Sequence, residues 1–186
     1  TPVVGTPGVS SNATVQVRVT GAVGVNGSIV MSFPDAGWSM PSETSVAFTL
    51  PSASLSSTGK WDASARELTL RLTGASAIPV ASDISFTIQD VVMPTSVRPA
   101  GDVSITTKDH GGAVIDGPSN FDLAAVTAGT FYGAMSLDVA PRSPGVETEV
   151  TVSFTVVGAV PSGGRFSLAF HEGWSMPGSV TVSFSA

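Results

Sequence analysis

Apolar and polar residues alternate along most of this 186-residue chain. Between Ala13 and Thr20 the odd positions are apolar, while the even positions carry Thr, Gln and Arg side chains. A period of two is typical of a strand with one buried face and one face in water. The same alternation predicts further strands with these inward-facing residues: Ile29, Met31 and Phe33; Val46, Phe48 and Leu50; Leu68, Leu70 and Leu72; Ile84, Phe86 and Ile88; Val103 and Ile105. No window of eleven or more residues has helical periodicity, so we expect an all-β chain.

Turn-forming residues separate the expected strands. Pro, Gly, Ser and Asp cluster at Pro51-Ser52, Ser56–Lys60, Gly74–Pro79, Met93–Gly101 and Lys108–Gly112. These residue types favour tight turns and interrupt regular pairing. Short strands spaced by turn clusters predict an antiparallel β-sandwich of immunoglobulin-like type.

The pentapeptide Gly-Trp-Ser-Met-Pro occurs twice, at 37–41 and at 173–177. The flanking residues match at an offset of 137 before the pentapeptide, and the offset falls to 136 at the Trp and to 134 after it. The inward residues of the first three strands have counterparts in the same phase: Val150, Val152, Phe154 and Val156; Phe166, Leu168 and Phe170; Val180, Val182 and Phe184. A slip of one residue would turn each set outward, so the shared phase indicates a shared register. The chain therefore contains an internal repeat, with strands expected in both copies.

The repeat length predicts the domain organisation. Residues 1–126 form one immunoglobulin-like unit, and residues 127–186 form the N-terminal part of a second, homologous unit. We expect the junction at Asp116–Gly129, because Gly117-Pro118-Ser119-Asn120 breaks the preceding strand. A new strand, Phe131–Val139, then points Met135, Leu137 and Val139 inward. Its counterpart would precede Thr1, so the first unit lacks its first strand, and a longer parent or a partner chain is expected to supply it.

Several segments carry a resemblance to known proteins. They are Gly27–Phe33 with the turn at 33–38, Ile84–Ile88 with Val91–Pro94, Val103–Thr107, and Gly112–Asp116. Their arrangement resembles the immunoglobulin-like repeats of large secreted and cell-surface proteins, including adhesins, S-layer-like proteins and extracellular filaments. The resemblance implies extracellular exposure, tandem arrangement and a role in assembly or adhesion.

Composition narrows the functional classes. Charged residues make up 12% of the chain, whereas Ser and Thr supply about a quarter, so the polar surface is mostly hydroxyl, as in extracellular β-repeat proteins. The net charge of −6 opposes binding to a phosphate backbone, which argues against nucleic acid as a partner. Neither an apolar run near 18 residues nor a basic amphipathic helix is present, which argues against membrane insertion. The absence of Cys excludes disulfides and thiolate chemistry without assigning a compartment. The N-terminal Thr indicates a processed or excised piece.

The repeated turns are the first candidate sites. Trp38, Met40 and Pro41, with Trp174, Met176 and Pro177, could present an aromatic docking surface for a sugar ring or a partner subunit. The favoured alternative is that both Trp residues close the end of the sandwich core, because Met and Pro beside them suit packing.

Two N-glycosylation sequons are present, Asn12-Ala13-Thr14 and Asn26-Gly27-Ser28. Asn12 is expected just before a strand and Asn26 in a Gly-rich turn, both exposed positions. The matching residues of the second copy are Glu149 and Gly163, so the fold does not demand the sequons. Chance triplets are common in a chain rich in Ser and Thr.

Other candidate chemistry is weaker. Five carboxylates near turns could hold Ca²⁺, but they lack a dense Asp-x-Asp pattern, so turn formation and surface solvation are favoured: Asp83, Asp90, Asp102, Asp109 and Asp116. His110 and His171 belong to no Ser-His-Asp pattern and are expected to be solvated. An isopeptide crosslink would need Lys60 or Lys108, and nothing around them marks one. No cofactor or metal is expected.

These observations favour a structural protein over an enzyme. The chain is predicted to be a repeat module of an extracellular filament, stalk or cell-surface assembly, joined head to tail, with strand exchange between units as an option. Its expected partners are copies of itself or adjacent repeats, and glycans. The alternative is an adhesin or carbohydrate-binding module of a secreted surface protein. An accessory β-domain of a secreted hydrolase, with catalytic residues elsewhere, is the third hypothesis.

Overall fold

The computed structural model describes residues 5–52, 54–160 and 162–184. The described chain is all-β, with 46% of residues in strands and no helix. The strands are β1 (Ser10–Arg18), β2 (Ser28–Ser32), β3 (Glu43–Thr44), β4 (Val46–Leu50), β5 (Ser57–Asp62), β6 (Glu67–Leu72), β7 (Asp83–Val92), β8 (Gly101–Lys108), β9 (Val114–Leu123), β10 (Tyr132–Ala140) and β11 (Glu149–Thr155).

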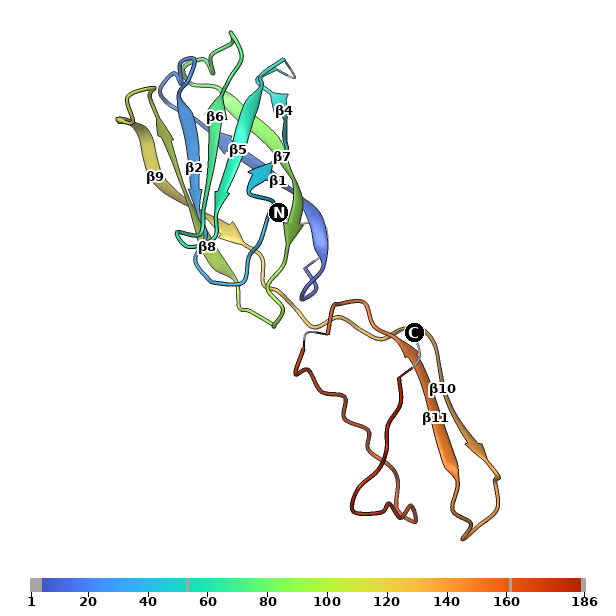
Figure 1. Cartoon of the computed structure of the whole chain (residues 1–186). Coiled ribbons are helices and arrows are strands. Elements are labelled where there is room, and N and C mark those ends of the chain that lie inside the picture. Colours follow the sequence, from blue (N-terminus) through green and yellow to red (C-terminus); the bar gives the residue numbers. More distant parts are fainter. Residues whose placement is uncertain (1–4, 53, 161, 185–186) are drawn as a thin grey trace.

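Two antiparallel sheets face each other and form the architecture of a β-sandwich (Figure 1). The smaller sheet has the strand order β1-β7-β4, and the larger has the order β3-β5-β6-β2-β8-β9. β3 and β4 are almost continuous, so one segment of chain passes from the larger sheet to the smaller and closes that side of the sandwich. The opposite side lies between β1 and β9.

The core fills the space between the two sheets. Its most deeply buried residues are Val23, Ile29, Leu68, Leu70, Leu72, Ile78, Phe86 and Met93, each with an exposed fraction of 0%. The alternation of the sequence therefore predicts the inward faces of β1, β2, β6, β7 and β8 correctly. Val126, 1% exposed, is the last buried residue along the described chain, and its backbone exchanges hydrogen bonds with that of Arg98.

Leu50 is the exception among the predicted inward residues of the first copy. It is 47% exposed, although Phe48 in the same strand is 4% exposed. The pairing of β4 with β7 shifts between Phe48 and Leu50, because Phe48 pairs with Phe86 while Leu50 pairs with the adjacent Ser85. A bulge of this kind changes the phase of the side chains beyond it, so Leu50 no longer points to the core.

Two expected turn regions are strands. All residues of Ser56–Lys60 except Ser56 belong to β5, which pairs with β6 and buries Gly59 and Trp61. The sequence Gly117-Pro118-Ser119-Asn120 does not end the preceding strand, since β9 continues to Leu123 beside β8. β9 is the edge strand of its sheet, where the missing N–H of Pro is tolerated. The first part of the expected junction Asp116–Gly129, up to Leu123, therefore belongs to β9.

The second copy differs from the first in pairing. β10 and β11 form a two-stranded hairpin beyond one end of the sandwich, and residues 162–184 contain no strand (Figure 1). The strands expected around Phe166–Phe170 and Val180–Phe184 are thus absent, and the predicted inward side chains Met135 and Leu137 are 65% and 45% exposed. In the first copy β2 pairs with β6 and β8, and β4 pairs with β7, whereas β10 and β11 are the only paired strands of the second copy among the described residues.

Candidate functional site

The first Gly-Trp-Ser-Met-Pro turn is packed into the sandwich. Trp38 is 6% exposed, and its ring lies 5.6 Å from that of Phe33, measured between centroids. Gly37 has a φ of +100°, a conformation that favours glycine, and it packs against Pro94. Ser39 exchanges two backbone hydrogen bonds with Val92, which fix the turn to the end of β7. Trp38 therefore has no face on which a sugar ring could stack.

The remaining residues of that turn divide between core and surface. Met40 is 6% exposed and belongs to the core, whereas Pro41 is exposed. The carbonyl oxygen of Pro41 accepts a hydrogen bond of 2.7 Å from the hydroxyl of Thr44. Pro41 thus anchors the short strand β3 that leads into the corner between the sheets.

The second turn has the same local geometry and a different environment. Trp174 packs on Phe170 with ring centroids 5.4 Å apart, and Gly173 has a φ of +94°. Trp174 is 44% exposed, Met176 is 47% exposed and Pro177 is exposed. Of the two tryptophans, only Trp174 offers an accessible aromatic surface.

A third tryptophan, which the sequence pattern did not single out, completes the aromatic end of the core. Trp61 is 7% exposed and meets Phe33 edge to face, with ring centroids 5.5 Å apart. Its indole N–H is buried without a hydrogen-bond partner among the described residues. The alternation of Ser57, Gly59 and Trp61 is the signal that could have identified this inward position.

Both sequon asparagines lie on the surface of the sandwich. Asn12 lies within β1 and not before it, at the point where the register with β7 shifts between Ser11 and Ala13. Asn26 has a φ of +63° in the turn before β2, where Gly27 N–H donates to the carbonyl oxygen of Gly24. Asn tolerates this left-handed conformation better than most residues, so the position has a backbone reason to be Asn or Gly.

Two of the five carboxylates considered as calcium ligands, Asp109 and Asp116, bind backbone N–H groups. Asp116 accepts hydrogen bonds from the N–H groups of Thr20 and Gly21 and from the hydroxyl of Thr107. Asp109 accepts from the N–H groups of its own turn, and Asp83 pairs with Arg18 at 3.0 Å. Among the described residues, no three His, Cys, Asp or Glu side chains are grouped to hold a metal ion.

Asp62 forms a similar turn between β5 and β6. Its carboxylate accepts hydrogen bonds from the hydroxyl and N–H of Ser64 and from the N–H of Ala65. These bonds favour the charged form, the Ser64 hydroxyl most of all, and they lower the pKa of Asp62 below its ordinary value of 3.8.

The remaining candidates stay apart. His110 and His171 are both exposed, one in the β8–β9 turn and the other in the second copy. The residues paired across the sheet with Lys60 are Glu43 and Thr69, and those paired with Lys108 are Ser28 and Val114. Neither lysine therefore has an Asn or Asp as its cross-strand partner.

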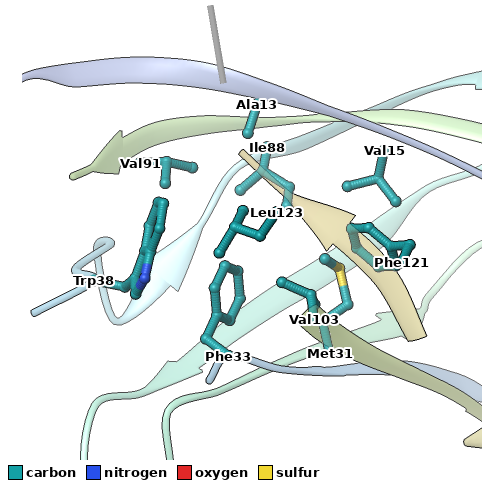
Figure 2. Close-up of a pocket in the computed structure, with 10 residues that line it drawn as sticks. All are labelled: Ala13, Val15, Met31, Phe33, Trp38, Ile88, Val91, Val103, Phe121 and Leu123. Carbon is teal, nitrogen blue, oxygen red and sulfur yellow. The ribbon is translucent and has the colours of Figure 1, made fainter. Parts of the chain in front are cut away.

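The core approaches the surface on the side of the sandwich between β1 and β9, which is called the open side below. A cavity of about 20 Å³ lies between the sheets, and all ten residues around it are apolar (Figure 2). Ala13 and Val15 from β1 border it on one side, and Phe121 and Leu123 from β9 lie between the sheets. A shallow depression of about 330 Å³ outside it shares Val15 and Phe121 with the cavity.

No helix in the described part of the chain is long and apolar enough to cross a membrane. Comparisons with known protein families, with curated proteins and with solved structures found no match to this chain.

Proposed function

We propose that this chain is a structural repeat module of an extracellular filament, stalk or cell-surface assembly, built from tandem immunoglobulin-like units. Its partners are copies of itself or adjacent repeats. The proposal follows from the internal repeat, from the contacts at the junction between the copies, and from a hydroxyl-rich surface with few charges.

The observation that carries the proposal is the recurrence of local conformation in the two copies. The Phe33–Trp38 ring pair, 5.6 Å apart and inclined by 39°, has a counterpart in Phe170–Trp174, 5.4 Å apart and inclined by 43°. β11 also corresponds to β1 at the offset of 137. Repeated local geometry at a fixed sequence interval is typical of tandem arrays whose units fold alike.

Small residues form the junction between the copies. A Cβ atom on Gly158 would lie 2.5 Å from the carbonyl oxygen of Pro7, and one on Gly129 would lie 2.7 Å from the Thr6 methyl group. Gly8 meets Ala159 in the same region. Backbones that approach this closely exclude larger side chains, so the junction suits a defined head-to-tail contact better than a loose tether.

Electron microscopy of the native material tests the proposal. A filament or stalk built from these units should appear as a rod or fibre with a regular axial repeat. Discrete globular monomers at high protein concentration would contradict it.

The exposure of Trp174 supports a second candidate, an adhesin or carbohydrate-binding module. An exposed aromatic ring beside Met176 could stack on a sugar. A glycan array probed with the protein and with the Trp174→Ala variant tests this function. Binding that is lost in Trp174→Ala, with an unchanged circular dichroism spectrum, would favour it, and the absence of glycan binding by the unmodified chain would refute it.

A further inference from the structure

The larger sheet has a second face, which points away from the core. This outer face consists of the residues of β3, β5, β6, β2, β8 and the end of β9 that alternate with the buried ones. The smaller sheet lies on the other face, and the β10–β11 hairpin lies beyond one end of the sandwich, so no described strand covers the outer face (Figure 1). Unlike the apolar cavity at the open side, the outer face is polar. Its side chains are therefore available to a charged or hydroxylated partner surface.

Cations lie at one end of the outer face. The pairing of β2 with β6 and β8 aligns Arg71, Ser28 and Lys108 in one row across three strands. Arg71 is exposed and Lys108 is half-buried. The row lies where β2 begins and where β6 and β8 end, so this end of the face is positively charged.

Carboxylates lie at the opposite end, in directly opposed pairs. Asp62 pairs with Glu67 across β5 and β6, and Asp102 pairs with Asp122 across β8 and β9. Like charges opposite each other destabilise an isolated sheet. Neither of the ion pairs between described residues includes any of these four carboxylates. A cationic partner surface would remove the repulsion at this end.

The row between the two ends carries no net charge. Val30 lies there between Thr69 and Thr106, its partners on β6 and β8, and is only 6% exposed although it belongs to the outer face. At the β3 end of the row, Glu43 is paired with Lys60, so that their charges offset each other. A second surface can therefore lie on this row without like-charge repulsion.

We propose that the outer face of the larger sheet binds the same face of a second copy in an antiparallel, twofold arrangement. The proposal rests on the proposed structural function, in which the module contacts copies of itself, and it adds the face and the orientation. A twofold axis that crosses the strands at the middle row sets each strand on its own counterpart, running in the opposite direction. Arg71 and Glu67 lie two residues to either side of Thr69 in β6, so Arg71 of each copy faces Glu67 of the other.

Charge selects this orientation over the alternative. A twofold axis parallel to the strands would set the cationic row of one copy on the cationic row of the other. The antiparallel orientation instead sets Lys108 over Ser104 and next to Asp102 of the other copy, at the acidic end. Complementary potentials of this kind determine the orientation of an interface more than they determine its affinity.

The place of the second repeat copy in the chain is compatible with such a pair. β9 ends at Leu123, beside the acidic end of the outer face, and the chain continues from there to β10. In the antiparallel pair the two continuing chains therefore leave from opposite ends.

The size of the face indicates a weak contact. Four strand spacings and six residues along a strand give an area of about 20 Å by about 20 Å. This is smaller than the roughly 800 Å² that each partner buries in a stable complex. Exposed ion pairs contribute little each and are screened by salt, so we expect a dimer that forms at low salt and dissociates at high salt.

Charge reversal at Arg71 and Glu67 tests the arrangement by analytical ultracentrifugation. Arg71→Glu alone, or Glu67→Arg alone, sets like charges opposite each other twice in the pair, and each change should weaken self-association at least about tenfold. An equimolar mixture of the two variants should form a heterodimer, because both contacts of that heterodimer again join opposite charges. A purely structural role of either residue would not produce this mutual rescue.

The matched controls are Arg18→Glu and Asp83→Arg. They change the net charge by the same amounts at exposed positions of the smaller sheet, so neither should weaken self-association. Circular dichroism verifies that each variant folds, and the salt dependence of the natural chain tests the proposal without any substitution.

Four results would each overturn the proposal. They are a natural chain that stays monomeric at low salt and about 1 mM protein, a dimer whose stability does not depend on salt, single reversals that associate as strongly as the natural chain, and a mixture of the two reversals without heterodimer. These results are separate from the test of the filament. Single rods seen by electron microscopy, without dimers in solution, would remove only the face-to-face contact, whereas rescued dimers without rods would refute only the filament.

Discussion

Replacing Trp38 with Ala tests whether the repeated turn serves the core or a ligand. The Trp38 ring is 6% exposed and packs against Phe33, which also contacts Trp61. Removing a buried Trp leaves a cavity that neighbouring side chains fill incompletely, at a cost of about 3–5 kcal/mol in the free energy of unfolding. The matched change Trp174→Ala, at a side chain that is 44% exposed, should cost less than about 1 kcal/mol.

Urea unfolding followed by far-ultraviolet circular dichroism measures both variants. We expect the core of the first sandwich to unfold as a unit in the natural chain and in both variants. Trp38→Ala should therefore lower the urea concentration at the midpoint of unfolding, with little change in the dependence of the free energy of unfolding on urea concentration. A Trp38→Phe variant, which retains a ring next to Phe33, should lose less stability than Trp38→Ala. A loss below about 1 kcal/mol for Trp38→Ala, or equal losses for Trp38→Ala and Trp174→Ala, would refute the assignment of Trp38 to the core.

Three further changes test other parts of the structure. Gly158→Ala should loosen the junction and increase proteolysis between the copies, whereas Gly24→Ala, where a Cβ meets no atom within 4 Å, should not. Asp116→Ala should lower the free energy of unfolding by about 1–3 kcal/mol, because it leaves partly buried backbone donors without an acceptor; exposed Asp102→Ala should change it little. The folded-state pKa of Asp62 is lowered, so its stabilisation is complete above pH 3.8 and is lost as the pH falls through the folded-state pKa. The stability difference between the natural chain and Asp62→Asn should shrink over that range; a difference independent of pH would contradict this.

The sequence predicts strands well where large apolar residues alternate with polar residues. Leu68, Leu70 and Leu72 alternate with polar residues and are fully buried. The alternation does not predict β5, because one of its inward positions is Gly59 and not a large apolar residue. A Cβ atom on Gly59 would lie 2.5 Å from the carbonyl oxygen of Thr44. The close approach of two backbones, and not local turn preference, explains that glycine, and such an approach cannot be read from alternation alone.

The second copy shows the limit of local information. The Phe170–Trp174 pair and the φ of Gly173 follow from neighbouring residues, and both match the first copy. In the first copy the matching strands β2 and β4 pair with strands distant in sequence, so neighbouring residues alone do not determine whether such strands form. Trp38 and Trp174 occupy the same motif and yet differ in burial, at 6% and 44% exposed, so the motif alone does not determine burial.

The edge at β9 has a consequence for the shape of any assembly. Pro118 and the register shifts opposite Ile105 and Thr107 make β9 a poor template for another strand, whereas β1 carries no proline between Ser10 and Arg18. Sheets from neighbouring molecules can therefore not fuse side by side through β9. The sandwich is thereby protected on this side against lateral aggregation, although β9 is a long strand at the border of its sheet.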